Sequence, residues 1–263
     1  MDSISKNELI NDLEALGDTR GCAVLVHSSV RAVGADAKAL LDALIEHFTK
    51  DGGLLCIPTH TWHNLKNDIT LDISSDDSCL GLLSRLAISD GRGVRSKNPT
   101  HSMVVFGDKE RALEFIKDDE FVKTPTAPES AYGKLCTQGG KILLIGVAHD
   151  RNTYLHTVDE ILGTPNRMSD KSRVVRVKDT DGTVTEHDFS LFDCDYTKDI
   201  STLFPKLETA FRYYRAITDG FVGNAPSQLC DAKIMKDTME LLYKNSDCDP
   251  LSIDGPIPQK WYV

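Results

Sequence analysis

The first half of the chain alternates between two hydrophobic patterns, one with helical spacing and one of short continuous apolar runs. Helical spacing over residues 6–17 and from Ala37 to Thr49 predicts two amphipathic helices. Asp36, just before the second of these, is a residue type that commonly caps helices. The apolar runs predict buried strands, which we expect at 22–26, 54–57, 103–106 and 142–147.

Further helices are predicted from Cys79 to Ile88 and from Asp108 to Ile116. Residues 63–78 and 118–130 lack a period and read as long loops, which in compact domains often form lids or binding elements. Because short buried strands alternate with helices, we expect an α/β fold. Its core would have three layers, α/β/α, around a mostly parallel or mixed sheet.

The pattern changes after residue 170. Polar and apolar residues alternate from Arg173 to Lys178 and from Val184 to Asp188, on either side of the turn Asp181-Gly182, which predicts a β-hairpin. Helices are expected at 198–212 and 226–243, with a small hairpin around Asp219-Gly220 between them. Residues 1–170 would therefore form the core, and residues 171–263 a smaller α+β lobe packed on it.

The charge balance restricts the partners. The 263 residues are 40% hydrophobic and carry a net charge of −10, from 30 basic and 40 acidic side chains. This excess of acid argues against nucleic acid or an anionic membrane surface as the main partner. It suits a polycationic substrate, and it equally suits the ordinary solubility of a cytosolic protein.

Three features favour the cytoplasm. The apolar runs are too short to span a membrane, and the first residues lack the basic-then-apolar pattern of a secretory signal. The seven cysteines are odd in number and form no CxxC pair. We expect them to be buried free thiols, as in a reducing compartment.

The stretch from Lys141 to Glu160 carries the most chemical information. An apolar strand leads through a turn to a helix that we expect Thr153 to cap, with His156 and Asp159 three apart and Glu160 four from His156. A histidine beside a carboxylate is what a general base needs, because the carboxylate can orient the imidazole and stabilise its protonated form.

Four other motifs lie near the ends of predicted strands or in a loop, where ligands bind in α/β proteins. They are VHSSVRAVG at 26–34, PTHTW at 58–62, RSKNPTHSMVVFG at 95–107 and TPTAPESAYGKL at 124–135. The first offers backbone N–H groups and Arg31 for a phosphate. Trp62 offers a stacking face and Glu129 a carboxylate for an ammonium. Each also reads as an ordinary turn, core or solvated residue.

A metal site is the main alternative from the residues alone. Six histidines fall near the ends of predicted elements: 27, 60, 63, 101, 149 and 156. A metal-dependent hydrolase would need three or four ligands converging, and no HExxH motif occurs. We expect no metal. The chain also lacks GxGxxG and GxxxxGK[ST] motifs, so neither a dinucleotide site nor a P-loop is predicted.

Together and in this order, the motifs resemble those of the aminoglycoside N(3)-acetyltransferase family. The correspondence covers His27 to Gly34, Pro58 to Thr61, Arg95 to Gly107, Ser130 to Leu135, Leu143 to Asp159 and a late segment from Gly220 to Lys233. Three positions depart from the family pattern. Asp159 stands in place of glutamate, Ala131 in place of proline, and His60 in place of an aromatic residue.

The resemblance implies direct transfer of an acetyl group from acetyl-CoA to a small-molecule amine, with the protein a monomer or homodimer. His156 would be the general base, oriented by Asp159 or Glu160, and an oxyanion donor would lie near Ser28 to Val30. The CoA-binding residues implied are His27, Ser28, Ser29, Val30, Arg31, Thr59, Thr61, His101 and Ser102. Trp62, Glu129 and Tyr132 are expected at the acceptor. A non-catalytic CoA-binding module remains a further alternative.

Overall fold

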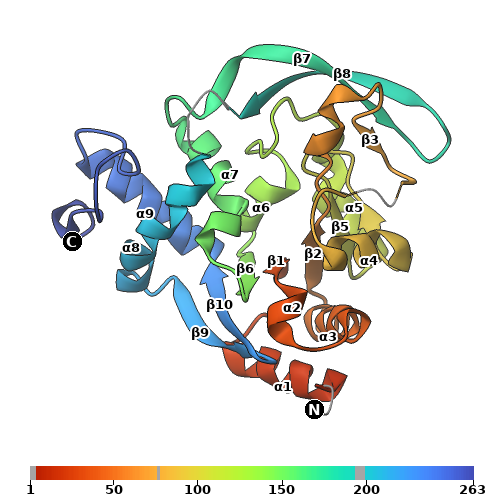
Figure 1. Cartoon of the computed structure of the whole chain (residues 1–263), viewed down its shortest axis with the longest axis horizontal. Coiled ribbons are helices and arrows are strands. Elements are labelled where there is room, and N and C mark those ends of the chain that lie inside the picture. Colours follow the sequence, from red (N-terminus) through yellow and green to blue (C-terminus); the bar gives the residue numbers. More distant parts are fainter. Residues whose placement is uncertain (1–3, 76–77, 193–198) are drawn as a thin grey trace.

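A seven-stranded mixed sheet forms the centre of the computed structural model, which describes residues 4–75, 78–192 and 199–263 (Figure 1). The strand order is β4-β5-β2-β1-β6-β10-β9. In chain order the strands are β1 (Ala23–Ser28), β2 (Leu54–Pro58), β4 (Val94–Arg95), β5 (Met103–Phe106), β6 (Lys141–Ile145), β9 (Ile217–Val222) and β10 (Ala225–Asp231). β1, β2 and β6 are parallel, whereas β5 and β10 run antiparallel to their neighbours. The expected mixed α/β fold is confirmed.

Helices cover both faces of this sheet and give it two apolar cores. One core is closed by α1 (Lys6–Leu16), α3 (Ala37–Thr49) and α4 (Leu82–Asp90). The other is closed by α5 (Lys109–Ile116), α6 (Ala131–Thr137), α7 (Tyr154–Leu162), α8 (Glu208–Tyr213) and α9 (Ala232–Asn245). The central strands β1, β2 and β6 are almost wholly buried, because both faces are covered, and this accounts for their continuous apolar sequences.

Local signals set several helix starts where the sequence predicts them. Asp36 accepts hydrogen bonds from the amides of Lys38 and Ala39 and so caps α3. Ser5 and Glu8 cap α1 reciprocally, each side chain bonding the other residue's backbone amide. Thr153 occupies the N-cap position of α7, as expected, but its side chain makes no capping hydrogen bond.

A second, three-stranded sheet lies at the opposite end of the molecule from α1 (Figure 1). It contains β3 (Leu71–Asp72), β7 (Met168–Lys178) and β8 (Val184–Phe192), in the order β3-β7-β8. The hairpin predicted across Asp181-Gly182 is confirmed, and Gly182 has the positive φ of 87° that this turn requires. A third apolar cluster, including Val175 and Phe189, anchors the hairpin to the loop that precedes α6.

The last third of the chain differs from expectation. Residues 226–231 form most of β10 rather than the start of a helix, because they pair with β6, and α9 begins only at Ala232. β9 and β10 thereby extend the main sheet, so the boundary expected at residue 170 does not separate the two sheets. The helix predicted at 198–212 is a 3₁₀ segment, η4 (Ile200–Leu207), followed by α8; residue 198 lies outside the described residues.

The remaining short elements lie in the connections. They are α2 (Val30–Val33), η1 (Trp62–Lys66), η2 (Lys117–Glu120), η3 (His149–Arg151) and η5 (Gln259–Trp261). The predicted loop 63–78 therefore contains most of η1 and all of β3, and α4 begins three residues after the predicted Cys79. No helix within the described residues is long and apolar enough to cross a bilayer.

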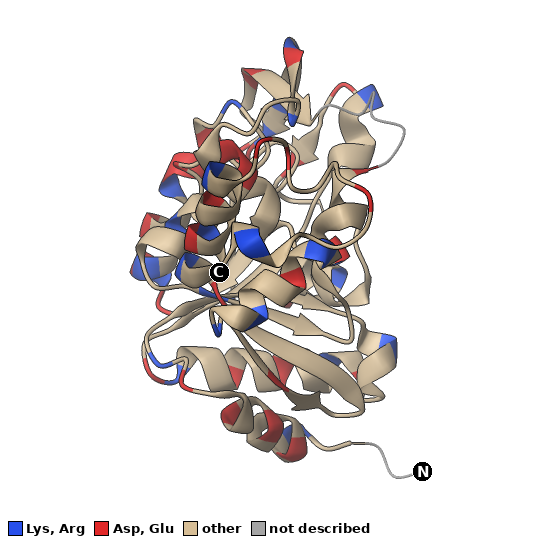
Figure 2. Ribbon diagram, turned by 90° about the vertical axis from the view of Figure 1, so that its left-hand side faces the viewer, with Lys and Arg blue, Asp and Glu red and all other residues tan. Residues whose placement is uncertain are grey.

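Charges and thiols are distributed over the whole fold. Figure 2 shows acidic and basic residues intermixed on the face that it presents, and on α9 they form pairs such as Lys236 with Glu240.

The six cysteines in the described residues are free, as expected. Only Cys56 and Cys230 are fully buried, whereas Cys248 is exposed, so the expectation of uniformly buried thiols is wrong. Cys194 lies outside the described residues.

Candidate functional site

One edge of the main sheet collects the ends of five strands. The parallel strands β1, β2 and β6 end there, and the antiparallel strands β5 and β10 begin there, with Met103 paired to Pro58 and Ser227 to Ile145. After β1 the chain passes to the face that carries α3, whereas after β6 it passes to the face that carries α7. Such a switch point opens a crevice between strand ends, which is the usual ligand site of open α/β sheets.

Four histidines meet at this crevice. His27 is near the end of β1, His60 follows β2, His101 precedes β5, and His156 is in the first turn of α7. The rings of His60 and His101 lie 4.2 Å apart between centroids, and His60 Nε2 is 3.0 Å from the Tyr132 hydroxyl oxygen. Burial lowers the pKa of His27 and of His101 to about 3, and that of His60 well below its usual value. The cluster is therefore neutral at pH 7.

His156 lies between two aromatic side chains. Its ring stacks on Phe192 at 4.4 Å and 24°, and it meets Phe204 edge-to-face at 4.9 Å and 68°. His156 is partly exposed. Its burial among neighbouring side chains nevertheless lowers its pKa to about 4, because a charged ring would be poorly solvated there. The negative charge of Asp199 raises this pKa and the positive charge of Arg167 lowers it, both by less than the burial effect.

The two carboxylates predicted to orient His156 point elsewhere. Asp159 Oδ2 accepts from Arg167 Nε at 2.9 Å, and its Oδ1 accepts from the Tyr243 hydroxyl at 2.9 Å. Glu160 accepts from the Thr124 hydroxyl and from both the amide and hydroxyl of Thr126. The expectation that one of these carboxylates pairs with His156 is thus corrected, because the oxygens of Asp159 and Glu160 accept hydrogen bonds from other donors. Within the described residues, the His156 imidazole makes neither a hydrogen bond nor an ion pair.

Three hydroxyls predicted to line CoA instead bind the protein itself. Thr59 Oγ1 and Ser102 Oγ are 2.9 Å apart, and Ser102 Oγ also lies 2.9 Å from the Thr59 carbonyl oxygen, within hydrogen-bonding distance. Thr61 Oγ1 donates to the Pro99 carbonyl at 3.0 Å. All three side chains are buried, so their hydroxyls fasten the β2 turn to the segment before β5. For these three residues, direct contact with CoA stays a prediction, and their hydroxyls bind protein groups in this structure.

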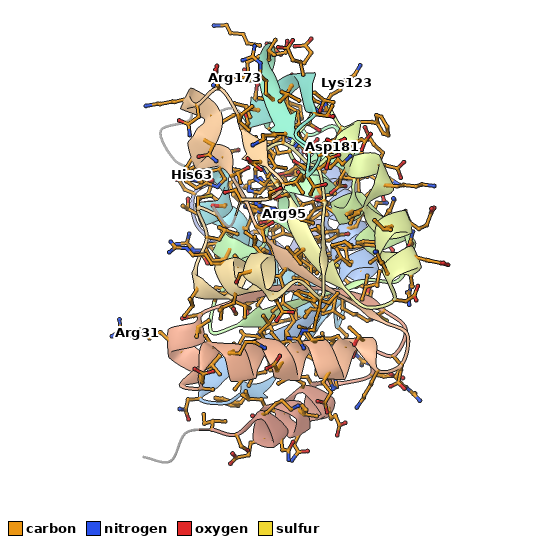
Figure 3. All side chains as sticks on the ribbon, turned by 90° about the vertical axis from the view of Figure 1, so that its right-hand side faces the viewer. Arg31, His63, Arg95, Lys123, Arg173 and Asp181 are labelled. Carbon is orange, nitrogen blue, oxygen red and sulfur yellow. The ribbon has the colours of Figure 1, made fainter. Side chains whose placement is uncertain are left out.

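The loop from β1 to α2 keeps its predicted surface. Ser29 caps α2 through the Ala32 amide, while the Ser29 amide donates to the Ile145 carbonyl at 2.8 Å. His27, Ser28, Ser29 and Val30 are partly exposed, and Arg31 projects away from the body (Figure 3). Beside them, Gly146 has a φ of +63° and permits close packing, since a Cβ there would lie 2.6 Å from that of Ala32.

The residues expected at the acceptor have different surroundings. Trp62 is 49% exposed, whereas Tyr132 is fully buried with its hydroxyl at His60, which corrects the expectation that Tyr132 contacts substrate. Glu129 is exposed and lines a pocket of about 440 Å³ beside the C-terminal half of α7. The walls also include Lys123, Thr124, Pro128, Asp159, Glu160, Gly163, Thr164 and Arg167.

The histidines do not assemble a metal site within the described residues, where no three His, Cys, Asp or Glu side chains are placed to hold an ion. His63 lies in η1 (Figure 3), and His149 is buried edge-to-face against Phe211, 5.4 Å between centroids.

Sequence reasoning missed Phe192, Phe204 and Arg167. Each reads as an ordinary hairpin, helix or loop residue, and no local signal marks it as a neighbour of α7.

The fold and the site define a mixed α/β protein with four histidines gathered at the strand ends of its sheet. Residues 25–244 match the family model described as aminoglycoside 3-N-acetyltransferase, and the chain belongs to that family. The resemblance seen in the motifs is therefore confirmed.

Curated relatives agree with this assignment. The chain is 31% identical over 166 residues to aminoglycoside N(3)-acetyltransferase IV of Salmonella sp, covering 61% of this chain and 60% of that protein. It is 28% identical over 265 residues to enzyme VII of Streptomyces paromomycinus, covering 89% of each. With enzyme VIII of Streptomyces fradiae the identity is 26% over 184 residues, or 62% of this chain and 63% of that protein. The matches to enzymes IV and VIII thus span about three fifths of those proteins.

Solved structures share the fold. The YokD protein of Bacillus subtilis superposes with a TM-score of 0.78 at 21% identity, covering 94% of this chain and 96% of that one. An AAC-IIIb binary complex with CoASH superposes with a TM-score of 0.78 at 22% sequence identity, covering 92% of this chain and 97% of that one. A mutant of AAC(3)-IVa in complex with a gentamicin superposes with a TM-score of 0.76 at 24% sequence identity, covering 91% of this chain and 88% of that one. At these identities the likeness concerns the fold.

Proposed function

We propose that this protein transfers the acetyl group of acetyl-CoA to an amine of an aminoglycoside or a related amino sugar, with His156 as general base. The observation that carries the proposal is a partly exposed, neutral imidazole in the first turn of α7, close to His60 and His101 at the strand ends. Family membership and the names of the relatives support the reaction class, and several of those relatives are aminoglycoside N(3)-acetyltransferases.

His156 would take a proton as the new C–N bond forms. Acetyl-CoA supplies an activated thioester, so no acyl-enzyme is required. The neutral acceptor nitrogen gives its electron pair to the thioester carbon, and the carbonyl pair moves onto oxygen. The nitrogen then becomes strongly acidic and loses its proton to His156, after which the C–S bond breaks and CoA leaves as a thiolate. A pKa near 4 makes His156 a weak base, but it keeps the ring in the proton-accepting form at pH 7.

The CoA moiety would lie along the β1–α2 loop. His27 Nε2 is buried without a hydrogen-bond partner, so a polar group of the bound ligand could satisfy it. The Ser29 amide is already bonded to the Ile145 carbonyl. We therefore assign the hydrogen bond to the oxyanion to the Ser28 hydroxyl or the Val30 amide. Arg31 is an exposed cation suited to the pyrophosphate.

The acceptor would lie in the pocket beside α7. Glu160, which lines that pocket, is four residues beyond His156, about 6 Å along the helix axis. Glu129, which also lines the pocket, is exposed and offers its carboxylate to an ammonium group. The net charge of −10 favours the approach of a polycation.

The test is release of free CoA thiol from acetyl-CoA across a panel of aminoglycosides, amino sugars and simple amines. Replacing His156 by alanine (H156A) should lower kcat by about 10² to 10⁴-fold, the usual contribution of a general base. Calorimetric affinity for acetyl-CoA should be retained.

The matched control is H187A. His187 lies five residues before Phe192 on β8, roughly 17 Å along the strand from the crevice, and should keep wild-type turnover. Unchanged turnover in H156A would remove His156 from the reaction. Acetyl-CoA binding without thiol release for any amine would indicate a binding module.

A further inference from the structure

Aromatic rings form a continuous row across the crevice. Phe192 contacts His156 on one side and His101 on the other, with centroids 4.4 Å and 5.5 Å away. The row continues from His101 to His60 at 4.2 Å and ends at Tyr132, and its other end is Phe204. Six segments of the chain contribute these rings, so tertiary packing alone assembles the row.

Phe192 lies nearly parallel against the flat face of His156, with an interplanar angle of 24°. The lone pair and the N–H bond of an imidazole lie in the ring plane, so a stacked phenyl ring restrains the plane without occupying either nitrogen. A carboxylate partner would occupy one nitrogen. Here the carboxylates of Asp159 and Glu160 are bound to Arg167, Tyr243, Thr124 and Thr126.

The β7–β8 hairpin fixes the position of Phe192. Phe192 is the last residue of β8 and pairs with Met168 at the start of β7. Two residues earlier, the Ser190 amide donates to the Lys123 carbonyl at 2.8 Å, and Phe189 is buried in the apolar cluster beneath the hairpin. Strand pairing and the buried Phe189 therefore fix the backbone at Phe192, so the ring that covers His156 does not sit on a free loop.

We propose that Phe192 is the positioning residue for His156, holding the imidazole plane by stacking in the role that a neighbouring carboxylate was expected to fill. This inference rests on the proposed general-base function. Phe204 restrains the ring from a second direction, edge-to-face. When the ring takes up a proton, the π face of Phe192 lies against the imidazolium and stabilises its charge. His156 thus gains a charge-stabilising neighbour while both of its nitrogens stay available to the substrate.

The experiment compares Phe192→Leu, which keeps apolar volume but loses the stack, with Phe192→Tyr, which keeps it. The Phe192→Leu variant should lower kcat by about 10-fold to 10²-fold, as expected for a misplaced reacting group, with KM for acetyl-CoA within about twofold. Phe192→Tyr should restore most of kcat. Phe221→Leu, at an exposed phenylalanine on β9 that is not part of the aromatic row, is the matched control and should retain wild-type kcat.

A second measurement does not depend on catalysis. In the ligand-free protein, a stacked phenyl ring shifts the NMR signals of the His156 ring protons upfield. This shift should vanish in Phe192→Leu and persist in Phe192→Tyr and Phe221→Leu. Loss of the shift with unchanged kcat would overturn the proposal, as would absence of the shift in the wild type. If the wild type acetylates no amine, the proposed function fails, and the NMR comparison still decides whether Phe192 sets the His156 ring.

Discussion

At the scale of single residues, helical spacing predicted neighbours but not partners. His156 and Asp159 are three apart on α7, as the sequence indicates, yet Asp159 turns to a buried group of donors and His156 to two phenyl rings. Arg167 also binds Asp249 at 2.8 Å, so one guanidinium ties the end of α7 to the C-terminal segment. We therefore expect Asp159 to stabilise the packing of α7 against the C-terminal segment.

Replacing Asp159 by asparagine should lower the free energy of unfolding by about 3 kcal/mol, because it leaves Arg167 buried with one of its charged partners removed. Urea denaturation measures the change. The control is Asp237→Asn on α9, in an exposed pair with Lys233, where the change should stay below about 0.5 kcal/mol. If Asp159→Asn left stability intact but abolished kcat, Asp159 would have to act on His156 after all.

At the scale of elements, α6 shows how a helix start is decided from a distance. Ser130 precedes the helix but its hydroxyl donates to the Ala127 carbonyl, while the Ala131 amide donates to the buried carboxylate of Asp119 at 2.7 Å. Burial raises the pKa of Asp119 to about 6, and one of its oxygens lacks a partner. The helix is thus capped from η2, by a residue 12 positions upstream, and packs closely on the loop between them.

Gly133 marks this close packing. A Cβ at Gly133 would lie 1.9 Å from the Pro128 carbonyl oxygen, so Gly133→Ala should destabilise the protein by about 3 kcal/mol or more through overpacking of rigid backbone. Thermal and urea unfolding test this. Gly81→Ala, where no atom lies within 4 Å, should change stability by less than about 0.5 kcal/mol. Equal effects of the two substitutions would contradict the packing argument.

At the scale of the whole molecule, burying neutral histidines makes stability depend on pH. The pKa values of His27 and His101 are lowered to about 3, those of His149 and His156 to about 4, and that of His60 well below its usual value. Below pH 6.5 the unfolded chain takes up protons at these five sites and the folded state does not. Their contribution to stability is therefore present at pH 7 and lost as the pH falls toward 4.

We predict acid unfolding between about pH 6 and pH 4, since each such histidine removes up to about 1.4 kcal/mol per pH unit. The raised pKa values of Asp119, Asp159 and Glu160 act in the opposite direction, because the folded state gains protons there, but they are three groups against five histidines. Circular dichroism and urea denaturation at pH 7, 5.5 and 4.5 measure the slope. His149→Gln should reduce the slope by nearly one proton, and a flat profile down to pH 4 would contradict the prediction.

The sequence by itself determined the local elements and the class of fold. Continuous apolar runs identified β1, β2, β5 and β6, because strands buried on both faces carry no polar alternation, and Asp36 and Gly182 marked a helix start and a turn through their own backbone and side-chain chemistry. The ordered motifs identified the family and directed attention to His156.

Only the tertiary structure decided which distant segments meet. Residues 226–231 became a strand because β6 offered an unpaired edge, although their sequence reads equally well as helix. The partners of His156 and Asp159 come from β8, η4, α9 and the segment after α7, many residues away. Hydrophobic periodicity records how one element is buried, but the identity of its neighbours depends on how all the elements pack at once.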